Sequence, residues 1–332
     1  MKTAVLGSGA WGTTFGAVLA DAGCDVTLWG RDGTVASEVT LRHSNERFLP
    51  GITLPELMVG TTDAHEALAD AEIVAVALPS QKVRAVIEPL VDAISPDATI
   101  VSLMKGVELA SHMRMSEVLA EVWRVPRGRV AVVSGPNLAK EIAAKQPTAT
   151  VVAASTQEVA ERVARATASG YFRPYTNTDV LGVELSGAYK NIIAVAVGIA
   201  GGMGFGHNTT ATVITRGLAE ITRLGLALGA RPDTFSGLAG MGDLIATCAS
   251  PLSRNHTLGA HIGSGAGLQD AIARTGGTAE GVTTCQSIQA LARDNNVDVP
   301  ICDAVVAMLH EGHPKEAVLG ALLSRPRKAE GA

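Results

Sequence analysis

The spacing of apolar and polar positions changes about halfway along the chain. In the first half, short apolar runs alternate with longer segments in which apolar residues recur at helical spacing. Short runs of this kind are typical of strands, and the longer spacing is typical of amphipathic helices. The predicted strands are 3–6, 25–29, 72–78, 98–103, 129–133, 148–153 and 171–175. The helices predicted between them are 13–22, 80–93, 111–123 and 157–168.

Beyond about residue 179 the strand pattern ends. Four long segments of helical spacing follow, at 180–199, 210–228, 281–294 and 301–310. Alternating strands and helices indicate a mostly parallel sheet covered by helices on both faces. We therefore expect an α/β protein, with a sheet domain at residues 1–179 and an all-α domain at residues 180–332.

Composition narrows the range of partners and locations. The length of 332 residues suits two domains. With a formal net charge of -5 and no basic stretch along a helix, a nucleic-acid partner is not expected. The longest apolar run, 192–205, is shorter than the roughly 20 residues that a bilayer requires, which argues against stable membrane insertion. The N-terminal residues lack a signal-peptide pattern, so a cytoplasmic location is expected.

The cysteines give no pattern of a metal site or a disulfide framework. They are Cys24, Cys248, Cys285 and Cys302, with no Cys-x-x-Cys spacing among them. We expect four reduced thiols and no bound metal.

A glycine-rich loop, Gly7-Ser8-Gly9-Ala10-Trp11-Gly12, follows the first predicted strand. Three glycines at this spacing recur by chance, and an ordinary turn is the alternative. Here the loop stands between a strand and an apolar-faced helix, with a second strand close behind, which is typical of a Rossmann-like dinucleotide-binding domain. Gly7 permits the tight turn, Gly9 lets the backbone approach a pyrophosphate, and Gly12 allows close helix packing.

The end of the second predicted strand bears on the choice between NAD and NADP. The sequence there is Trp29-Gly30-Arg31-Asp32. An acidic residue at this place binds the ribose 2′-hydroxyl, whereas an arginine accommodates a 2′-phosphate. Arg31 favours NADP, although Asp32 leaves NAD open and a solvated loop charge is the alternative for Arg31.

Lys190 is a candidate acid–base residue. It lies in a helical segment that becomes strongly apolar just beyond it. A lysine at such a border often extends its ammonium to water, and this structural alternative stays open. Gly187, one helical turn earlier on the same face, would leave room for a ligand beside the ammonium. Partial burial would lower the pKa of the Lys190 amine toward neutrality, as acid–base chemistry requires.

A second polar cluster follows the glycines of Gly240-Met241-Gly242. Its members are Asp243, Ser253, Arg254 and Asn255. Asp243 could simply cap a helix, and Arg254 could be a surface arginine at a helix start. As a set, however, a guanidinium, a hydroxyl and an amide suit a phosphate monoester.

Two loops follow predicted strands and carry polar groups. Lys105 comes after strand 98–103, and Gly135-Pro136-Asn137 comes after strand 129–133. Ligands collect at the carboxyl ends of strands in an open α/β sheet, so both loops should face the nicotinamide. Lys105 is a candidate substrate cation, although a lysine at a strand end is equally ordinary.

Several motifs in order, through nearly the whole length, resemble those of the bacterial-type NAD(P)-dependent glycerol-3-phosphate dehydrogenases. Besides the glycine loop they are Lys105-Gly106, Gly135-Pro136-Asn137-Leu138-Ala139-Lys140-Glu141, Glu184-Leu185-Ser186-Gly187-Ala188-Tyr189-Lys190-Asn191, Asn208 to Arg216-Gly217-Leu218, Gly240-Met241-Gly242-Asp243-Leu244, Ser253-Arg254-Asn255 and Ala279-Glu280-Gly281. Asn137 stands where that family usually has serine or threonine.

The resemblance implies a reaction and a set of contacts. The reaction is reversible hydride transfer between NAD(P)H and dihydroxyacetone phosphate, which yields sn-glycerol 3-phosphate for phospholipid synthesis, with Lys190 as general acid–base and a homodimer as the assembly. The implied substrate contacts are Lys105, Gly135, Asn137, Lys190, Asp243, Ser253, Arg254 and Asn255. The implied cofactor contacts, besides the three loop glycines, are Ala10, Trp11, Arg31, Lys105, Ala139, Arg254, Thr278 and Glu280.

Two other functions remain as alternatives. A β-hydroxyacid or 6-phosphogluconate type dehydrogenase pairs the same kind of domains with a lysine base, but that family places an asparagine four residues after its lysine, where this chain has Ala194. A regulator that senses NAD(P) without turnover would not require a lysine, an acid and a phosphate-binding arginine together.

Overall fold

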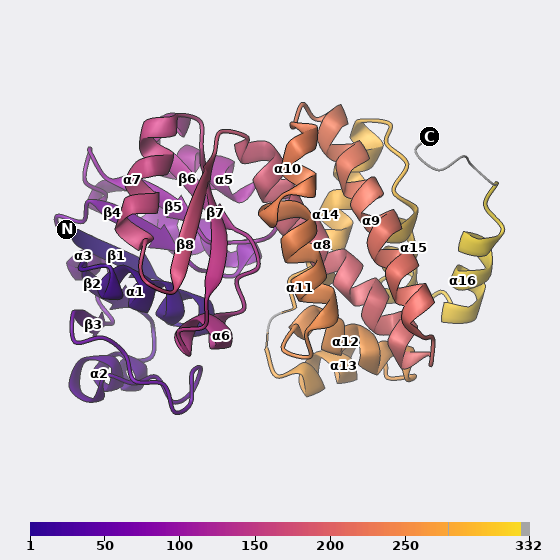
Figure 1. The fold of residues 1–332 in the computed structure, drawn as a ribbon, viewed down its shortest axis with the longest axis horizontal. Helices are drawn as coiled ribbons and strands as arrows, with labels where there is room; N and C mark the ends of the chain where they lie inside the picture. The colour runs from indigo at the N-terminus through magenta and orange to yellow at the C-terminus, as the bar shows by residue number, and fades with distance from the viewer. Residues whose placement is uncertain (278, 327–332) are drawn as a thin grey trace.

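The computed structural model describes residues 1–277 and 279–326. Figure 1 shows a sheet-containing part, which holds the N-terminus, and beside it a part built of helices. The sheet ends at Asn177, and the long helix that opens the second part begins at Val180.

A single sheet organises the N-terminal part. Its strands in the described residues lie in the order β3-β2-β1-β4-β5-β6-β7-β8. All neighbouring strands are parallel except β6 and β7, so the predicted mostly parallel sheet is confirmed. The bounds are β1 (Lys2–Leu6), β2 (Asp25–Trp29), β3 (Met58–Thr61), β4 (Ile73–Val76), β5 (Thr99–Ser102), β6 (Val130–Ser134), β7 (Thr148–Ala154) and β8 (Phe172–Asn177).

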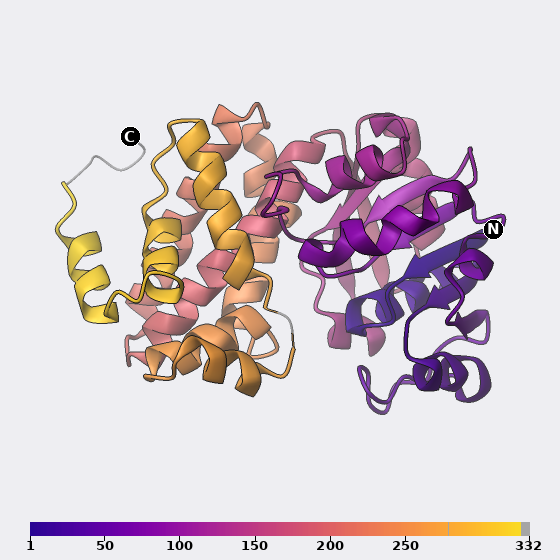
Figure 2. The ribbon, with the colours of Figure 1, turned by 180° about the vertical axis from the view of Figure 1, so that it is seen from behind.

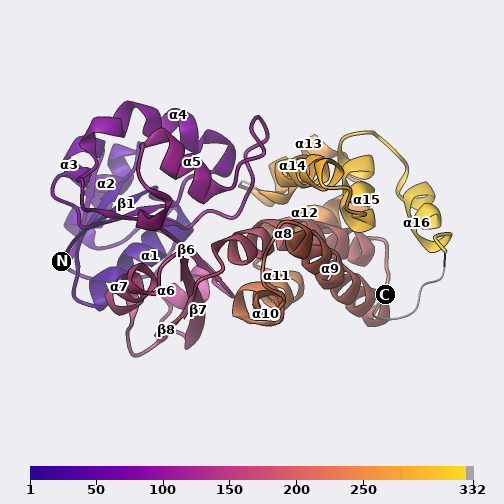
Figure 3. The same ribbon diagram turned by 90° about the horizontal axis from the view of Figure 1, so that it is seen from above.

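Helices cover both faces of the sheet. Because side chains alternate along a strand, Val5 of β1 joins one apolar core and its neighbours Ala4 and Leu6 join another. Figure 3 shows the resulting three layers. One face carries α1 (Ala10–Asp21), α6 (Ala139–Ala143) and α7 (Gln157–Thr167), and the other carries α3 (Ala64–Leu68), α4 (Val83–Ile87) and α5 (Met115–Val122).

Several local predictions for this part need correction. Helix α1 begins at Ala10 rather than residue 13, and α5 begins at Met115 rather than 111. The predicted helix 80–93 is a short α4 between two 3₁₀ segments, since Pro89 has no N–H to continue an α-helix. The sequence-based prediction missed the helices α2 (Gly33–Arg42), α3 and α6, and the edge strand β3, which is short and half polar.

The second part is all helical in the described residues. Its long central helix α8 is surrounded by the others, and Figure 2 shows the last of them, in orange and yellow, from the reverse side. The bounds are α8 (Val180–Gly202), α9 (His207–Ala227), α10 (Pro232–Ser236), α11 (Asp243–Ala249), α12 (Arg254–Gly263), α13 (Leu268–Thr275), α14 (Gly281–Asp294), α15 (Pro300–Leu309) and α16 (Lys315–Leu323), with a π-helical turn at Leu238–Gly242.

Helix α8 is the core of the helical part. The helix has 23 residues and contains an 18-residue window with a mean hydropathy of 1.4, so it is long and apolar enough to cross a membrane, but 83% of that window is buried inside the protein. Ile192 and Ile193 are fully buried among the surrounding helices. The apolar run therefore belongs to a core helix, as its length had indicated.

Helices α8 and α12 cross with their backbones in contact. Gly198 and Gly202 of α8 face Gly259 and Gly263 of α12. A Cβ atom at Gly259 would lie 2.2 Å from a backbone oxygen of α8, so no side chain fits there. This close approach brings the first turn of α12 against the part of α8 that carries the candidate site.

Candidate active site

The glycine loop has the geometry of a pyrophosphate cradle. Gly7 has a φ of +122°, and a Cβ at Gly12 would meet the Gly7 carbonyl oxygen at 1.9 Å. Around Gly9 the described part of the chain leaves open space. Gly9 precedes α1, whose first internal hydrogen bond is from Thr13 to Gly9. The N–H groups of the first turn are therefore free for an anion, and the residues fit a dinucleotide.

Other predicted cofactor residues surround this loop. The Trp11 indole N–H donates to the Leu103 carbonyl, 3.2 Å away at the end of β5. Thr14 donates to the Ala139 carbonyl, which places the start of α6 beside α1. Arg31 is exposed just after β2. Thr278, another predicted cofactor contact, lies outside the described residues.

Two lysines from different parts of the chain share one buried carboxylate. Asp243, 1% exposed at the start of α11, accepts a hydrogen bond from the Lys190 ammonium of α8 and another, at 2.6 Å, from the Lys105 ammonium. Lys190 also donates to the Thr247 hydroxyl at 2.7 Å, and Lys105 to the Gly135 carbonyl at 3.0 Å. The predicted residues 105, 135, 190 and 243 thus meet at one point.

The cluster keeps Lys190 ready to exchange a proton. Burial lowers the pKa of the Lys190 amine to about 7, against the opposing effect of Asp243 and with a further lowering from Lys105. Two ammonium groups around one carboxylate leave the site positive when all three are ionised. Such a site stabilises negative charge that develops on a substrate oxygen. Lys190 is buried rather than extended to water, so the surface alternative is wrong.

Thr247 is a member of this cluster that sequence reasoning did not single out. It follows Asp243 by one turn of α11, so both side chains lie on the same helix face. That spacing was a usable signal once Asp243 had been chosen.

Gly187 does not make room for a ligand, contrary to expectation. A Cβ there would lie 2.7 Å from the Ser134 hydroxyl and 3.4 Å from the Lys105 side chain. The glycine instead lets α8 approach the ends of β5 and β6. In the loop after β6, the Asn137 amide is buried and lacks a hydrogen-bond partner within the described chain. Buried amides are normally satisfied, so this one is available to a ligand.

A chain of amides connects Lys105 to the helical part. The Asn191 amide donates to the Lys105 carbonyl at 3.2 Å, and the Asn255 amide donates to Asn191 at 3.0 Å. The Asn255 carbonyl oxygen accepts from the N–H of Gly281, also at 3.0 Å. Asn255 is therefore less free for a ligand than its position in the cluster indicated, because its oxygen and one of its two N–H bonds are engaged.

The remaining predicted residues lie at the start of α12 and before α14. Ser253 caps α12 by accepting from the His256 N–H, and Arg254 follows it with an exposed side chain. Glu280 accepts the N–H and the hydroxyl of Ser80 from the sheet part. Burial raises the pKa of Glu280, while Ser80 and Arg254 oppose that rise. Glu280 thus ties the two parts of the molecule together.

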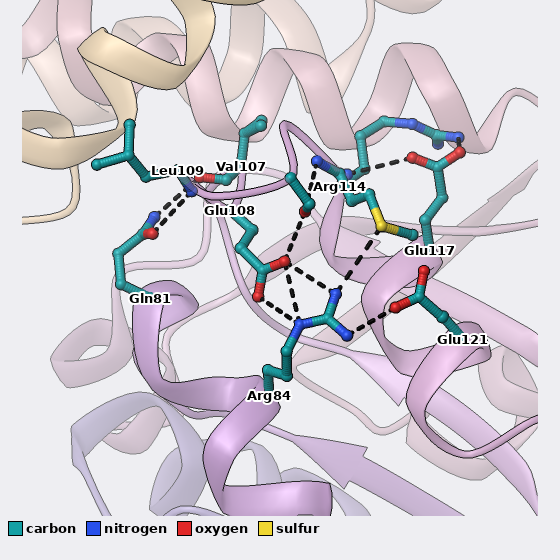
Figure 4. Close-up of polar contacts among 10 residues, drawn as sticks. Gln81, Arg84, Val107, Glu108, Leu109, Arg114, Glu117 and Glu121 are labelled. Atoms are coloured by element: carbon teal, nitrogen blue, oxygen red, sulfur yellow. Dashed lines mark hydrogen bonds and ion pairs between the residues drawn. The ribbon is translucent and has the colours of Figure 1, made fainter.

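The loop that carries Lys105 is held by an ion-pair network, shown in Figure 4. Arg84 of α4 makes bonds of 2.9 to 3.2 Å to Glu108 and one of 2.7 Å to Glu121. Gln81 donates to the Val107 carbonyl at 2.8 Å, and that carbonyl also accepts from Ser287 of α14. The loop is therefore fixed to both parts of the molecule.

Replacing Arg84 by methionine should weaken this support. Glu108 is 9% exposed as a side chain, so losing its partner should lower the free energy of unfolding by about 1 to 3 kcal/mol. The looser loop should raise the KM for the substrate, which Lys105 is predicted to contact. Urea unfolding and steady-state kinetics measure the two effects. The control Arg162→Met removes a surface pair at 3.5 Å and should change neither; equal effects of both variants would refute this role.

Together, the sheet with its glycine loop and the buried lysine–carboxylate cluster beside it define a dinucleotide-dependent dehydrogenase. A model of the NAD-dependent glycerol-3-phosphate dehydrogenase N-terminus matches residues 2–160, and a model of the C-terminus of the same family matches residues 179–320. The chain belongs to this family, which confirms the resemblance drawn from its motifs.

Individual relatives agree over the full length. A glycerol-3-phosphate dehydrogenase (NAD(P)+) of Streptomyces griseus is 56% identical over 330 residues, 99% of this chain and 98% of that protein. One of Thermobifida fusca is 52% identical over the same shares. A crystal structure of the Coxiella burnetii enzyme has a TM-score of 0.91 at 34% identity, covering 97% of this chain and 98% of that one. These matches favour this family over the hydroxyacid dehydrogenase and the regulator.

Proposed function

We propose that this protein catalyses the reversible NAD(P)H-dependent reduction of dihydroxyacetone phosphate to sn-glycerol 3-phosphate. The observation that carries the proposal is the buried Lys190 ammonium, held by Asp243 and Thr247 with a pKa near neutrality. The identity of the substrate is inferred from the glycerol-3-phosphate dehydrogenases that the chain resembles. The domain division at residues 179 and 180 is part of the proposal, with the acid–base residue and most of the substrate residues on the helical side.

Lys190 acts as the general acid in reduction and the general base in oxidation. When bound, the dinucleotide supplies or accepts the hydride. As the carbonyl oxygen of the substrate gains charge, the Lys190 ammonium donates its proton to it. Asp243 orients the ammonium and Thr247 fixes it from the second side. Lys105, which shares Asp243 with Lys190, lies beside them and stabilises the developing alkoxide.

The start of α12 binds the phosphate of the substrate. Arg254 offers a planar set of donors, and Ser253 and the free N–H of Asn255 add neutral ones. The unpaired Asn137 amide and the Gly135 turn complete the substrate contacts. Because the phosphate does not react, its binding energy serves to orient the carbonyl for hydride transfer.

The glycine loop holds the pyrophosphate, with Ala10, Trp11 and Ala139 alongside it, and Arg254 and Glu280 approach from the helical part. Arg31 faces the adenosine ribose and favours NADP. Phospholipid synthesis as the use of the product, the homodimer and the cytoplasmic location stay predictions.

Replacing Arg31 by alanine should raise the KM for NADPH far more than the KM for NADH. The reason is that the guanidinium would pair with the 2′-phosphate that only NADPH carries. Initial rates with each cofactor at saturating substrate measure the two constants. Equal changes for both cofactors would contradict this role.

The assay that tests the function itself is NADPH oxidation followed by absorbance. Dihydroxyacetone phosphate should support turnover, whereas 3-hydroxyacid dehydrogenase substrates should not. Binding of NADPH without oxidation by dihydroxyacetone phosphate would instead favour the non-catalytic regulator.

A further inference from the structure

The segment after α2 is anchored to the glycine loop. Asn45 is fully buried, and its amide donates to the Ser8 carbonyl at 3.1 Å and to the Thr13 hydroxyl at 2.8 Å. Ser8 lies inside the glycine loop and Thr13 in the first turns of α1. A polar side chain buried against the loop in this way fixes where the following residues stand relative to a bound dinucleotide.

The same segment is also anchored to α2. Glu38 of α2 accepts the Ser44 hydroxyl at 2.9 Å and the Glu46 N–H at 3.0 Å. With Asn45 held on the other side, the backbone up to residue 47 has little freedom to move away from the end of β2. Arg47 therefore projects from a fixed position.

The Arg47 side chain lies at the end of β2. Its guanidinium donates to Asp32 at 2.8 Å and stands over the Phe48 ring at 5.2 Å from the centroid. The other carboxylate oxygen of Asp32 accepts the Thr34 N–H and caps α2. Both oxygens of Asp32 are thus engaged by the protein. Asp32, whose place in the sequence left NAD binding open, pairs with Arg47 in the structure.

We infer that Arg47, together with Arg31, forms a 2′-phosphate site, and that Asp32 positions Arg47 instead of binding the ribose. Arg31 neighbours Asp32 in the sequence and Arg47 pairs with it, so two guanidinium groups accompany this one carboxylate, a set that suits a phosphate dianion better than a ribose hydroxyl. Arg47 is 65% exposed as a side chain, so it is accessible to a ligand. The inference rests on the proposed function only in that a dinucleotide binds on the glycine loop.

Calorimetry with two probes that differ only in this phosphate tests the inference. Arg47→Gln should weaken binding of 2′,5′-ADP by about 10- to 100-fold, since a bond to a charged group is lost, while binding of 5′-AMP should stay unchanged. Arg47→Lys keeps the charge and should recover part of the loss. Unchanged 2′,5′-ADP binding, or an equal loss for both probes, would overturn the inference.

Two further variants separate the roles of the neighbouring groups. Arg42→Gln removes an exposed arginine from the last turn of α2 and should alter neither probe. Asp32→Asn keeps a good helix cap and a side-chain oxygen that can accept from Arg47, so Arg47 stays positioned, but it removes the negative charge, and 2′,5′-ADP should bind more tightly. A loss of 5′-AMP binding in this variant would mean that Asp32 holds the ribose, against the inference. Neither probe needs turnover, so failure of dihydroxyacetone phosphate reduction would be seen separately.

Discussion

Replacing Lys190 by alanine should lower kcat for dihydroxyacetone phosphate reduction by about 10²- to 10⁴-fold, the usual contribution of a general acid. The variant loses the proton donor, while the glycine loop and Arg254 remain. The KM for NADPH should therefore change little. Stopped-flow and steady-state measurements of NADPH oxidation give both values, and turnover near that of the wild type would remove Lys190 from its role.

The pH dependence of the reaction rate in each direction should also reflect the protonation of Lys190. Reduction needs the protonated amine, so its rate should fall as the pH rises through about 7, the pKa that burial gives Lys190. Oxidation of glycerol 3-phosphate needs the neutral amine, so its rate should rise over the same range. In Lys190→Ala both limbs should disappear. A limb that persists unchanged in the variant would belong to another group.

Two variants guard against a trivial loss of structure. Lys190→Met keeps most of the buried side-chain volume, and Asp243 retains its bond to Lys105, so this variant should fold yet be as inactive as the alanine form. Lys140→Ala removes an exposed lysine from α6 and should behave like the wild type. Circular dichroism at the assay temperature compares the folding of all three.

The strands could be predicted from the sequence where both of their faces are buried. Strands β1, β4 and β5 are covered on both faces, and such strands give continuous apolar runs that stand out in the sequence. Strand β3 lies at the edge, exposes Val59, and includes Gly60, against which α2 packs so closely that a Cβ would meet the Ala36 carbonyl at 2.5 Å. Its pattern reflects a tertiary contact, which no local window contains.

The same limit applies to the site. The residue types needed for hydride transfer were visible as candidates, although a lysine beside an apolar helical segment and an acid after glycines also have ordinary structural explanations. What could not be predicted is that Lys105 and Lys190 meet on one oxygen pair of Asp243, since that depends on how α11 packs on α8. Likewise, Asp32 could be seen beside Arg31, but its pairing with Arg47 required the path of the chain after α2.

The crossing of α8 and α12 determines the spacing between the acid–base lysine and the phosphate-binding arginine. Gly259 is one place to test this, because its Cβ would lie 2.2 Å from the Val195 carbonyl oxygen. A carbon–oxygen contact needs about 3.3 Å, so Gly259→Ala must push the helices apart by about 1 Å. Arg254, in the first turn of α12, would move with its helix relative to Lys190.

Gly259→Ala should therefore lower the free energy of unfolding by about 3 kcal/mol, the upper range for overpacking. A 1 Å displacement of groups that orient the substrate should also lower kcat/KM by up to about 10²-fold. Gly201→Ala is the matched control: a Cβ there meets nothing within 4 Å in the described residues, so it should leave activity unchanged and stabilise α8 by up to about 1 kcal/mol. Equal free energies of unfolding for the two variants in urea would contradict this prediction. They would mean that α8 and α12 can move apart at little cost, so that the spacing between Lys190 and Arg254 does not depend on these glycines.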